Sequence, residues 1–311
     1  MKFGKFFVAP LLALGFIVLT SMEVSAASYL YNQDNEAVES PDVYTVSQEI
    51  VLEADGVVAI SPQDVFCSNS GRVYVVDTKN HRILIYNNQY KQMAVLSSFF
   101  MQDGNETTLL EPEGIYVDEN EIMYIADTGN HRIIKCDIQG NVILQIEKPE
   151  NLTGIDKDSA FNPTKLSVDK SGRIYVVARN YNLGILQLDV NGKFVGYVGA
   201  PKVQYNIIQM LWRKISTEEQ LAKMEQYVPT EYNNIAIDEE GFIYGTIGTL
   251  DAEEGEKTIE SNDTSGTVTP IKKLNTVGND VLKRNGFSAP IGDLEYEAVY
   301  SKIVDVTYTT G

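Results

Sequence analysis

The sequence is poor in the residues that build metal and cofactor sites. Its 311 residues include two His, two Cys and one Trp, which leaves few side chains for a zinc or iron–sulfur centre made by the protein itself. Lys and Arg number 25 against 43 Asp and Glu, so the formal net charge is −18. A surface of this sign repels phosphates, which excludes nucleic acid as a partner and a polybasic mode of membrane binding.

Long apolar runs are also scarce. The run at residues 6–20 follows two lysines and precedes a Val-Ser-Ala sequence. A charged start, an apolar stretch and then small residues are typical of a secretory signal, so we expect residues 1–26 to be a signal peptide. An uncleaved N-terminal anchor is the alternative. No later segment is long enough for a membrane span, so the protein is expected to be secreted or at the cell surface, outside the cytoplasm.

The two cysteines lie inside alternating apolar runs. Cys67 and Cys136 could pair in an oxidising compartment, but two cysteines do not make a disulfide framework. We expect both to be buried as small apolar side chains, with a disulfide between them as the alternative.

Internal repetition is the most informative feature of the chain. The stretch that opens at Pro62 returns at Pro112, and two weaker copies follow. Each copy has an apolar run, an Asp-x-x-Gly hairpin or its equivalent, and a β-branched run that contains a tyrosine. The aligned tyrosines are Tyr74, Tyr124, Tyr175 and Tyr244. The copies cover residues 59–98, 109–147, 160–199 and 230–275, approximately.

Each copy predicts four short antiparallel strands. In the first copy the last two strands are expected at 83–86 and 92–96. Four strands in about 50 residues are typical of a propeller blade, and nearly continuous apolar strands suit a blade that is covered on both faces. The sequence therefore predicts an all-β protein in which blades stack around a common axis.

A turn of sequence Asp-Thr-x-Asn-His-Arg follows the second strand in the first two copies. Its repeated residues are Asp77, Asn80, His81 and Arg82, and Asp127, Asn130, His131 and Arg132. Together with the hairpin and the Pro-containing opening, this turn resembles the NHL repeat family, named for its Asn-His-Leu triplet. The resemblance covers roughly residues 44–311 and implies a β-propeller domain over residues 27–311.

These repeated residues are expected to be structural. The aspartates are placed to accept backbone N–H bonds from the following turn. The imidazoles are expected to bond to their own turn, and a metal site shared by the two histidines is the alternative.

The third copy departs from the repeat, because Ala178-Arg-Asn-Tyr-Asn replaces the Asp-Thr-x-Asn-His turn. Arg179 and Tyr181 are therefore candidates for binding a ligand or partner. A helical insertion is expected at about 203–227, where apolar residues recur at helical spacing and a capping box begins a second helix. The insertion either packs on the blades beneath it or covers one mouth of the channel, with Tyr205 and Trp212 facing a ligand.

Two further segments lie beyond the third copy. The acidic insertion at 249–266 is expected to be a solvated loop, with calcium binding as the alternative. Residues 302–311 resemble the opening strand of another blade, so a partial blade from residue 301 and about five to six blades are expected. Either the ring closes irregularly through residues 28–58, or the sequence is a fragment of a longer protein, which we favour because a propeller must close.

The sequence contains no Gly-x-Ser-x-Gly elbow, P-loop or dinucleotide fingerprint. The first hypothesis is an exported, non-catalytic binding or scaffold propeller that needs no cofactor and engages a protein, peptide or glycan through its loop faces. The second comes from the resemblance, since some such propellers are lyases or lactonases. It is a metal-dependent lyase or hydrolase with calcium or zinc in the channel. The third is an extracytoplasmic sensor domain of a membrane-anchored protein.

Overall fold

The structure is a computed structural model, and its chain divides into two units. One unit comprises residues 1–48 and 290–295, and the other comprises residues 49–289 and 296–311. The described residues are 29–31, 37–39, 49–179, 181–200, 231–248, 255, 257–258, 261–265, 269–284 and 305–307. The expected signal peptide at 1–26 and the helical insertion at about 203–227, with Tyr205 and Trp212, lie outside these residues. In the first unit the structure describes one antiparallel hairpin, β1 (Tyr29–Tyr31) with β2 (Ala37–Glu39).

Among its described residues, the second unit contains four antiparallel meander sheets, which we call blades 1 to 4. It also contains two short two-stranded hairpins, β3 (Glu53–Ala54) with β4 (Val57–Val58), and β9 (Ser98–Phe100) with β10 (Glu106–Thr108). Blade 1 consists of β5 (Asp64–Cys67), β6 (Val73–Asp77), β7 (Arg82–Tyr86) and β8 (Gln92–Leu96). Blade 2 consists of β11 (Gly114–Val117), β12 (Met123–Asp127), β13 (Arg132–Cys136) and β14 (Val142–Ile146). Blade 3 consists of β15 (Pro163–Val168), β16 (Ile174–Ala178), β17 (Ile185–Leu188) and β18 (Phe194–Val198). Blade 4 consists of β19 (Tyr232–Ile237), β20 (Ile243–Ile247) and β21 (Ile271–Leu274).

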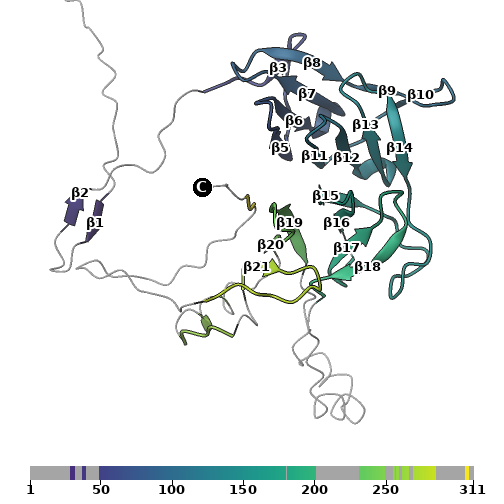
Figure 1. Ribbon diagram of the computed structural model, residues 1–311. Coiled ribbons are helices and arrows are strands. Elements are labelled where there is room, and N and C mark those ends of the chain that lie inside the picture. The colour runs from purple at the N-terminus through teal and green to yellow at the C-terminus, as the bar shows by residue number, and fades with distance from the viewer. Residues whose placement is uncertain are drawn as a thin grey trace, which may run out of the picture. The chain divides into compact units, whose positions relative to one another are not determined.

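The blades succeed one another around a common axis, with β5, β11, β15 and β19 innermost (Figure 1). This arrangement confirms the all-β propeller of four-stranded blades. The described residues contain four blades, the last with three strands. Of the further blade expected from residue 301, the structure describes 305–307.

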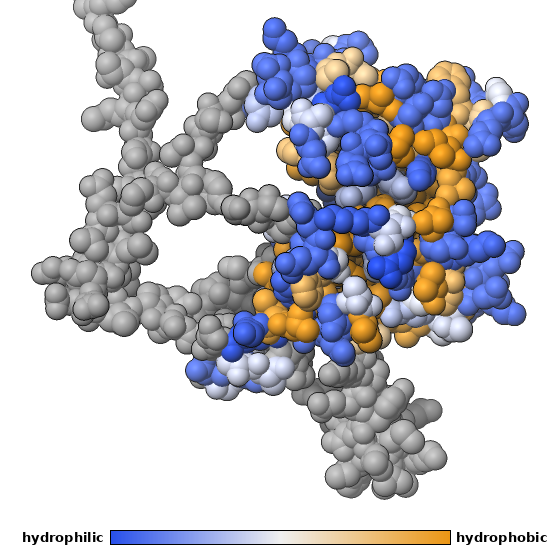
Figure 2. All heavy atoms as spheres, viewed as in Figure 1, coloured by the Kyte–Doolittle hydropathy of each residue, from blue (hydrophilic) through white to orange (hydrophobic). Residues whose placement is uncertain are grey.

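Apolar side chains on both faces of the second strand of blades 1 to 3 make most of the core. Along β6, Tyr74 and Val76 pack against blade 2, whereas Val75 packs on the other face, against the hairpin of β3 (Glu53–Ala54) and β4 (Val57–Val58). Successive residues of a strand point to opposite faces, so a run without polar residues suits a sheet that is covered twice. On the face seen in Figure 2, hydrophilic residues predominate, and hydrophobic residues are interspersed among them.

The Asp-Thr-x-Asn-His-Arg turn forms one turn of 3-10 helix after β6 and after β12 (Thr78–Asn80 and Thr128–Asn130). Asp77 accepts from the side chains of Asn80 and Arg82 at 2.9 and 2.7 Å. Its backbone partner is the N–H of Ile60, at 2.8 Å. The expectation that the aspartate accepts backbone N–H groups of the following turn is therefore wrong: the donor precedes the blade, and side chains of the turn supply the other bonds.

In the first two blades the turn also fastens the blade to the next one. The Thr78 hydroxyl donates to the carbonyl of Pro112 at 2.7 Å, and the Thr128 hydroxyl donates to the carbonyl of Pro163 at 2.6 Å. The backbone N–H of Glu111 donates to Nδ1 of His81 at 2.9 Å. The histidines bond through their imidazoles to the segments that lead into the following blades rather than to their own turn, which corrects our expectation. Their left-handed backbone (φ 54° at His81) goes with a ring that contacts the following blade.

The cysteines differ from each other in burial, and both are free thiols. Cys136 is buried as expected, but Cys67 is exposed. The positions equivalent to Cys67 in blades 2, 3 and 4 are Val117, Val168 and Ile237, which are 4%, 7% and 8% exposed. Each of those lies on a blade that follows another described blade, whereas β5 belongs to the first.

Candidate ligand-binding site

One repeat position of the innermost strands brings side chains together around the axis of the blades, and we call this central region the channel. This position is occupied by Asp64, Gly114, Lys165 and Asn234 in blades 1 to 4. Nζ of Lys165 lies 2.8 Å from Oδ1 of Asp64 and donates to the carbonyl of Gln63 at 2.7 Å. The amide of Asn234 donates to the carboxylate of Asp305 at 2.5 Å. The channel is thus lined by charged and amide groups that bond to one another.

Neighbouring groups shift the pKa of Asp64 in opposite directions. Burial raises the pKa of its carboxyl group, and Lys165 lowers it through charge and a hydrogen bond. The backbone N–H of Ile115, at 2.8 Å, also favours the ionised form, whereas Asp305 disfavours it. The net shift is upward, so desolvation is only partly offset by the ion pair.

A cavity of about 240 Å³ opens at the mouth of this channel, on the side of blades 3 and 4. It is bounded by residues at the starts of the innermost strands, by the end of β16 and by the turn after β16. Its lining residues are Gln63, Glu113, Thr164, Lys165, Val177, Ala178, Arg179, Tyr181, Gly184, Glu231, Tyr232 and Asn233. Four of these directly precede the channel residue of their blade, namely Gln63, Glu113, Thr164 and Asn233. The sequence candidates Arg179 and Tyr181 both lie in its wall.

The cavity lies where the connection between blades changes. In blades 1 and 2 the turn threonine donates to the carbonyl of the proline that opens the next blade. In blade 3, Arg179 stands at the threonine position, and Tyr232 stands at the proline position of blade 4. We call the hydrogen bond from the turn threonine to the next blade the threonine staple. It is absent between these two described blades, and charged, solvent-accessible side chains take its place.

Arg179 has unused hydrogen-bonding capacity. Its Nη2 donates to both carboxylate oxygens of Glu113, at 2.9 and 2.8 Å. The Nε and Nη1 atoms have no acceptor among the described residues, and the side chain is 52% exposed. By contrast, all three nitrogens of Arg82 have acceptors, in Asp77 and in the carbonyls of Ala54 and Val57.

Tyr181 contributes a buried wall rather than an exposed anchor. It is 4% exposed and lies against Phe161, with ring centroids 6.1 Å apart. Burial and the neighbouring Tyr197 raise the pKa of Tyr181 to about 12. Both tyrosine hydroxyls are buried without a hydrogen-bond partner in the described part of the chain, so this side of blade 3 carries unpaired polar groups.

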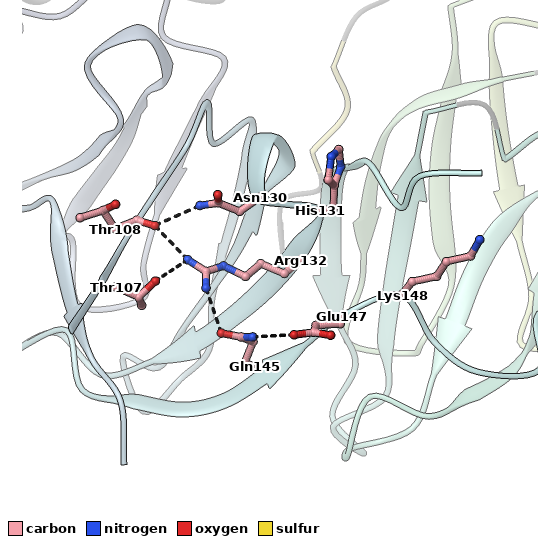
Figure 3. Close-up of a pocket in the computed structure, with 8 residues that line it drawn as sticks. All are labelled: Thr107, Thr108, Asn130, His131, Arg132, Gln145, Glu147 and Lys148. Carbon is pink, nitrogen blue, oxygen red and sulfur yellow. Dashed lines mark hydrogen bonds between the residues drawn. The ribbon is translucent and has the colours of Figure 1, made fainter. Parts of the chain in front are cut away.

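A second, larger cavity of about 420 Å³ lies on blade 2 and includes Arg132 and Lys148 (Figure 3). Arg132 reaches between the strand β10 (Glu106–Thr108) and Gln145, and its nitrogens donate to acceptors on both sides. Nζ of Lys148 donates to three backbone carbonyls. The cations of this cavity are therefore occupied by the protein's own acceptors, which makes it a weaker candidate than the channel mouth.

The described residues contain no group of three or more His, Cys, Asp or Glu side chains placed to hold a metal ion. Nδ1 of His131 lies 2.6 Å from the amide oxygen of Asn162, in the segment before blade 3. Each histidine is therefore bonded into a different junction between blades.

Among the described residues, no helix has the length and apolar character to cross a membrane.

Sequence reasoning missed Asp64, Lys165 and Glu113. The signal was present in the repeat alignment, because one column reads Asp, Gly, Lys and Asn while the column after it is apolar in all four copies. Alternation places that column on the face of the innermost strand opposite to the apolar column that follows it. Reading the repeats by columns, rather than by their common motif, would have identified it.

Comparisons with known proteins agree on the repeat. The family model for the NHL repeat matches residues 61–86, so the chain carries an NHL repeat there. No curated protein matches the chain.

Several solved structures match the chain at low identity. Virginiamycin B lyase from Staphylococcus aureus has 14% identity and a TM-score of 0.40, over 81% of this chain and 60% of the lyase. A protein of unknown function from Bacteroides caccae has 11% identity and a TM-score of 0.41, over 81% of this chain and 66% of that one. A gluconolactonase from Xanthomonas campestris has 14% identity and a TM-score of 0.40, over 71% and 62%. The chain thus spans about three fifths of the lyase, and neither enzyme's activity is carried over to it.

Proposed function

We propose that this protein is an exported, non-catalytic binding propeller that captures a protein, peptide or glycan at the mouth of its channel. The observation that carries the proposal is the coincidence of the cavity with the one junction among the four described blades where the threonine staple is replaced by Arg179. Recognition sites are typically concave and carry a few placed polar groups on a rigid scaffold.

The chemistry of the cavity suits binding. Its wall combines the apolar groups of Val177 and Ala178 with the charges of Glu113 and Arg179. The charged channel groups below it are already paired, since Lys165 is bonded to Asp64. A ligand would therefore contact paired charges at the bottom of the cavity and, at its rim, side chains that can still form hydrogen bonds. This arrangement favours binding over bond cleavage.

The test is a binding screen of the purified protein against peptide and glycan arrays, repeated with Gln63→Trp. Gln63 is exposed and lines the mouth, so an indole there is expected to obstruct the cavity without entering the core. Gln92→Trp, an exposed position on the outermost strand of the same blade, is the matched control. Captured ligands should be lost with the first variant and kept with the second. Capture that survives Gln63→Trp would refute the site.

The proposal places the protein outside the cytoplasm and assigns it no cofactor. It also differs measurably from the metal-dependent lyase or hydrolase hypothesis. Elemental analysis of the purified protein, followed by dialysis against a chelator, separates the two: binding that persists after chelation is expected here. Loss of captured ligand with loss of zinc or calcium would favour the enzyme hypothesis.

A further inference from the structure

Arg179 keeps free guanidinium donors at the mouth of the channel. Both of its bonds to Glu113 come from Nη2, which leaves Nε and Nη1 without acceptors in the described residues. A guanidinium binds a carboxylate by two parallel hydrogen bonds through Nε with Nη2 or through Nη1 with Nη2. Both arrangements include Nη2, so such a ligand must compete with Glu113 for that atom. By contrast, every guanidinium nitrogen of Arg82 and Arg132, at a nearby position of the first two turns, already has an acceptor.

The other residues of the cavity restrict the chemistry and size of the ligand further. Tyr232, Val177 and Ala178 line the same cavity and offer apolar surface beside the guanidinium. A volume of about 240 Å³ is enough for a group of the size of one large amino-acid side chain with its carboxylate. The net charge of −18 disfavours anions in general, so an anionic ligand would depend on this local cation.

We infer that the channel mouth recognises a carboxylate joined to an apolar body, with Arg179 as the anchor and Glu113 as an internal competitor for it. The inference rests on the proposed function and specifies its ligand chemistry. Glu113 holds the guanidinium in place when no ligand is present. An incoming carboxylate accepts from Nη1 or Nε and competes with Glu113 for Nη2. A peptide C-terminus and a free small acid both carry this chemistry.

Calorimetry with matched probes tests the inference. The probes are N-acetylleucine and N-acetylleucinamide, and a leucine-terminated hexapeptide as the free acid and as the amide. We expect the acids to bind at least about tenfold more tightly than the amides, since hydrogen bonds to charged groups are the stronger kind. Binding of the hexapeptide acid alone would identify peptide termini as the source, and binding of N-acetylleucine alone would identify small acids.

Variants assign the effect to residues. Arg179→Gln should remove the preference for the acids, and Arg179→Lys should restore part of it because the charge remains but the planar edge is lost. Glu113→Gln should tighten acid binding by about threefold, in keeping with the modest strength of exposed ion pairs. Arg173→Gln is the control, because Arg173 is also partly exposed and paired with a carboxylate, that of Asp169, but it lies at the other end of β16.

Three outcomes would overturn the inference: acids that bind no better than amides, acid binding that survives Arg179→Gln, and the absence of binding by every acid. None of these decides the proposed function, which is tested by Gln63→Trp with ligands from the arrays. Array ligands that are lost with Gln63→Trp but kept with Arg179→Gln would retain the mouth as the binding site and reject carboxylate recognition.

Discussion

Nζ of Lys165 in blade 3 lies 2.8 Å from Oδ1 of Asp64 in blade 1, with the two side chains each 14% exposed. Blade 2 lies between these blades in the chain and contributes Gly114 at the same repeat position. Because glycine has no side chain, the lysine and the aspartate can meet without obstruction from blade 2. The pair therefore ties two non-adjacent blades together at the channel.

Lys165→Met should destabilise the protein by about 3 kcal/mol, since removing one partner leaves the other charge buried without compensation. Adding Asp64→Asn should recover part of this loss, because the buried charge is then gone. Urea denaturation of the wild type, both single variants and the double variant measures the coupling. Strictly additive losses would show that the two side chains do not interact in the folded protein.

Gly114→Ala should destabilise the protein by about 3 kcal/mol or more. A Cβ at this position would lie 2.4 Å from the carbonyl oxygen of Thr164 and 3.0 Å from Cα of Lys165, so the backbones of β11 and β15 would have to separate. Gly196→Ala in β18 is the control, because a Cβ there meets nothing within 4 Å. The two variants should differ clearly in their midpoints of urea denaturation. Equal midpoints would mean that β15 can move aside at little cost.

Glu121 adopts a left-handed backbone (φ 60°) at a hairpin position where Gly71, Gly172 and Gly241 stand in the other blades. Its carboxylate accepts from the Tyr74 hydroxyl of blade 1 and lies 3.2 Å from a guanidinium nitrogen of Arg72. In blades 3 and 4 the equivalent tyrosine bonds to an aspartate of its own hairpin, but blade 1 has Ser68 there. Glu121 thus supplies the missing carboxylate from the next blade.

This carboxylate should make stability depend on pH. Burial raises the pKa of Glu121, but hydrogen bonds from Tyr74, Ser70, Ser68 and Arg72 outweigh it and lower the pKa below its usual value of 4.5. A lowered pKa means stabilisation that is present above pH 4.5 and is lost as the pH falls below it. Glu121→Gln keeps the backbone strain and removes the charge, so it should cost about 1 kcal/mol at pH 7 and little at pH 3.

Urea denaturation at the two pH values measures this difference. Glu119→Gln, which changes an exposed neighbour in the same hairpin, should have little effect at either pH. A loss for Glu121→Gln that is the same at pH 7 and pH 3 would contradict a role for the ionised carboxylate.

The sequence was sufficient to predict the blades because each blade repeats one local pattern. The aligned tyrosines, the hairpins and the third-copy departure at Arg179 and Tyr181 are all visible in a single chain. The direction of the His81 ring was not, because a left-handed residue that ends a turn can face its own turn or the next blade, and only the neighbouring backbone of Glu111 decides.

The charge pairs needed the third dimension. The alignment gives the column that holds Asp64 and Lys165, but their contact depends on the diameter of the channel and on the bare Gly114 between them. The mistaken burial of Cys67 has a similar origin: alternation along β5 gives the face on which Cys67 lies, but whether another sheet packs on that face depends on the order of the blades.

The two thiols should therefore differ sharply in reactivity. Cys67 is exposed and Cys136 is buried, and burial raises the pKa of the Cys136 thiol, with a further contribution from Asp137. Since the thiolate is the nucleophile, iodoacetamide at pH 8 should modify Cys67 in the native protein more than about 100-fold faster than Cys136. Mass spectrometry of proteolytic fragments over time measures both rates in one sample, and unfolding in urea should make them equal. Native protection of Cys67 equal to that of Cys136 would mean that its face of blade 1 is covered in solution.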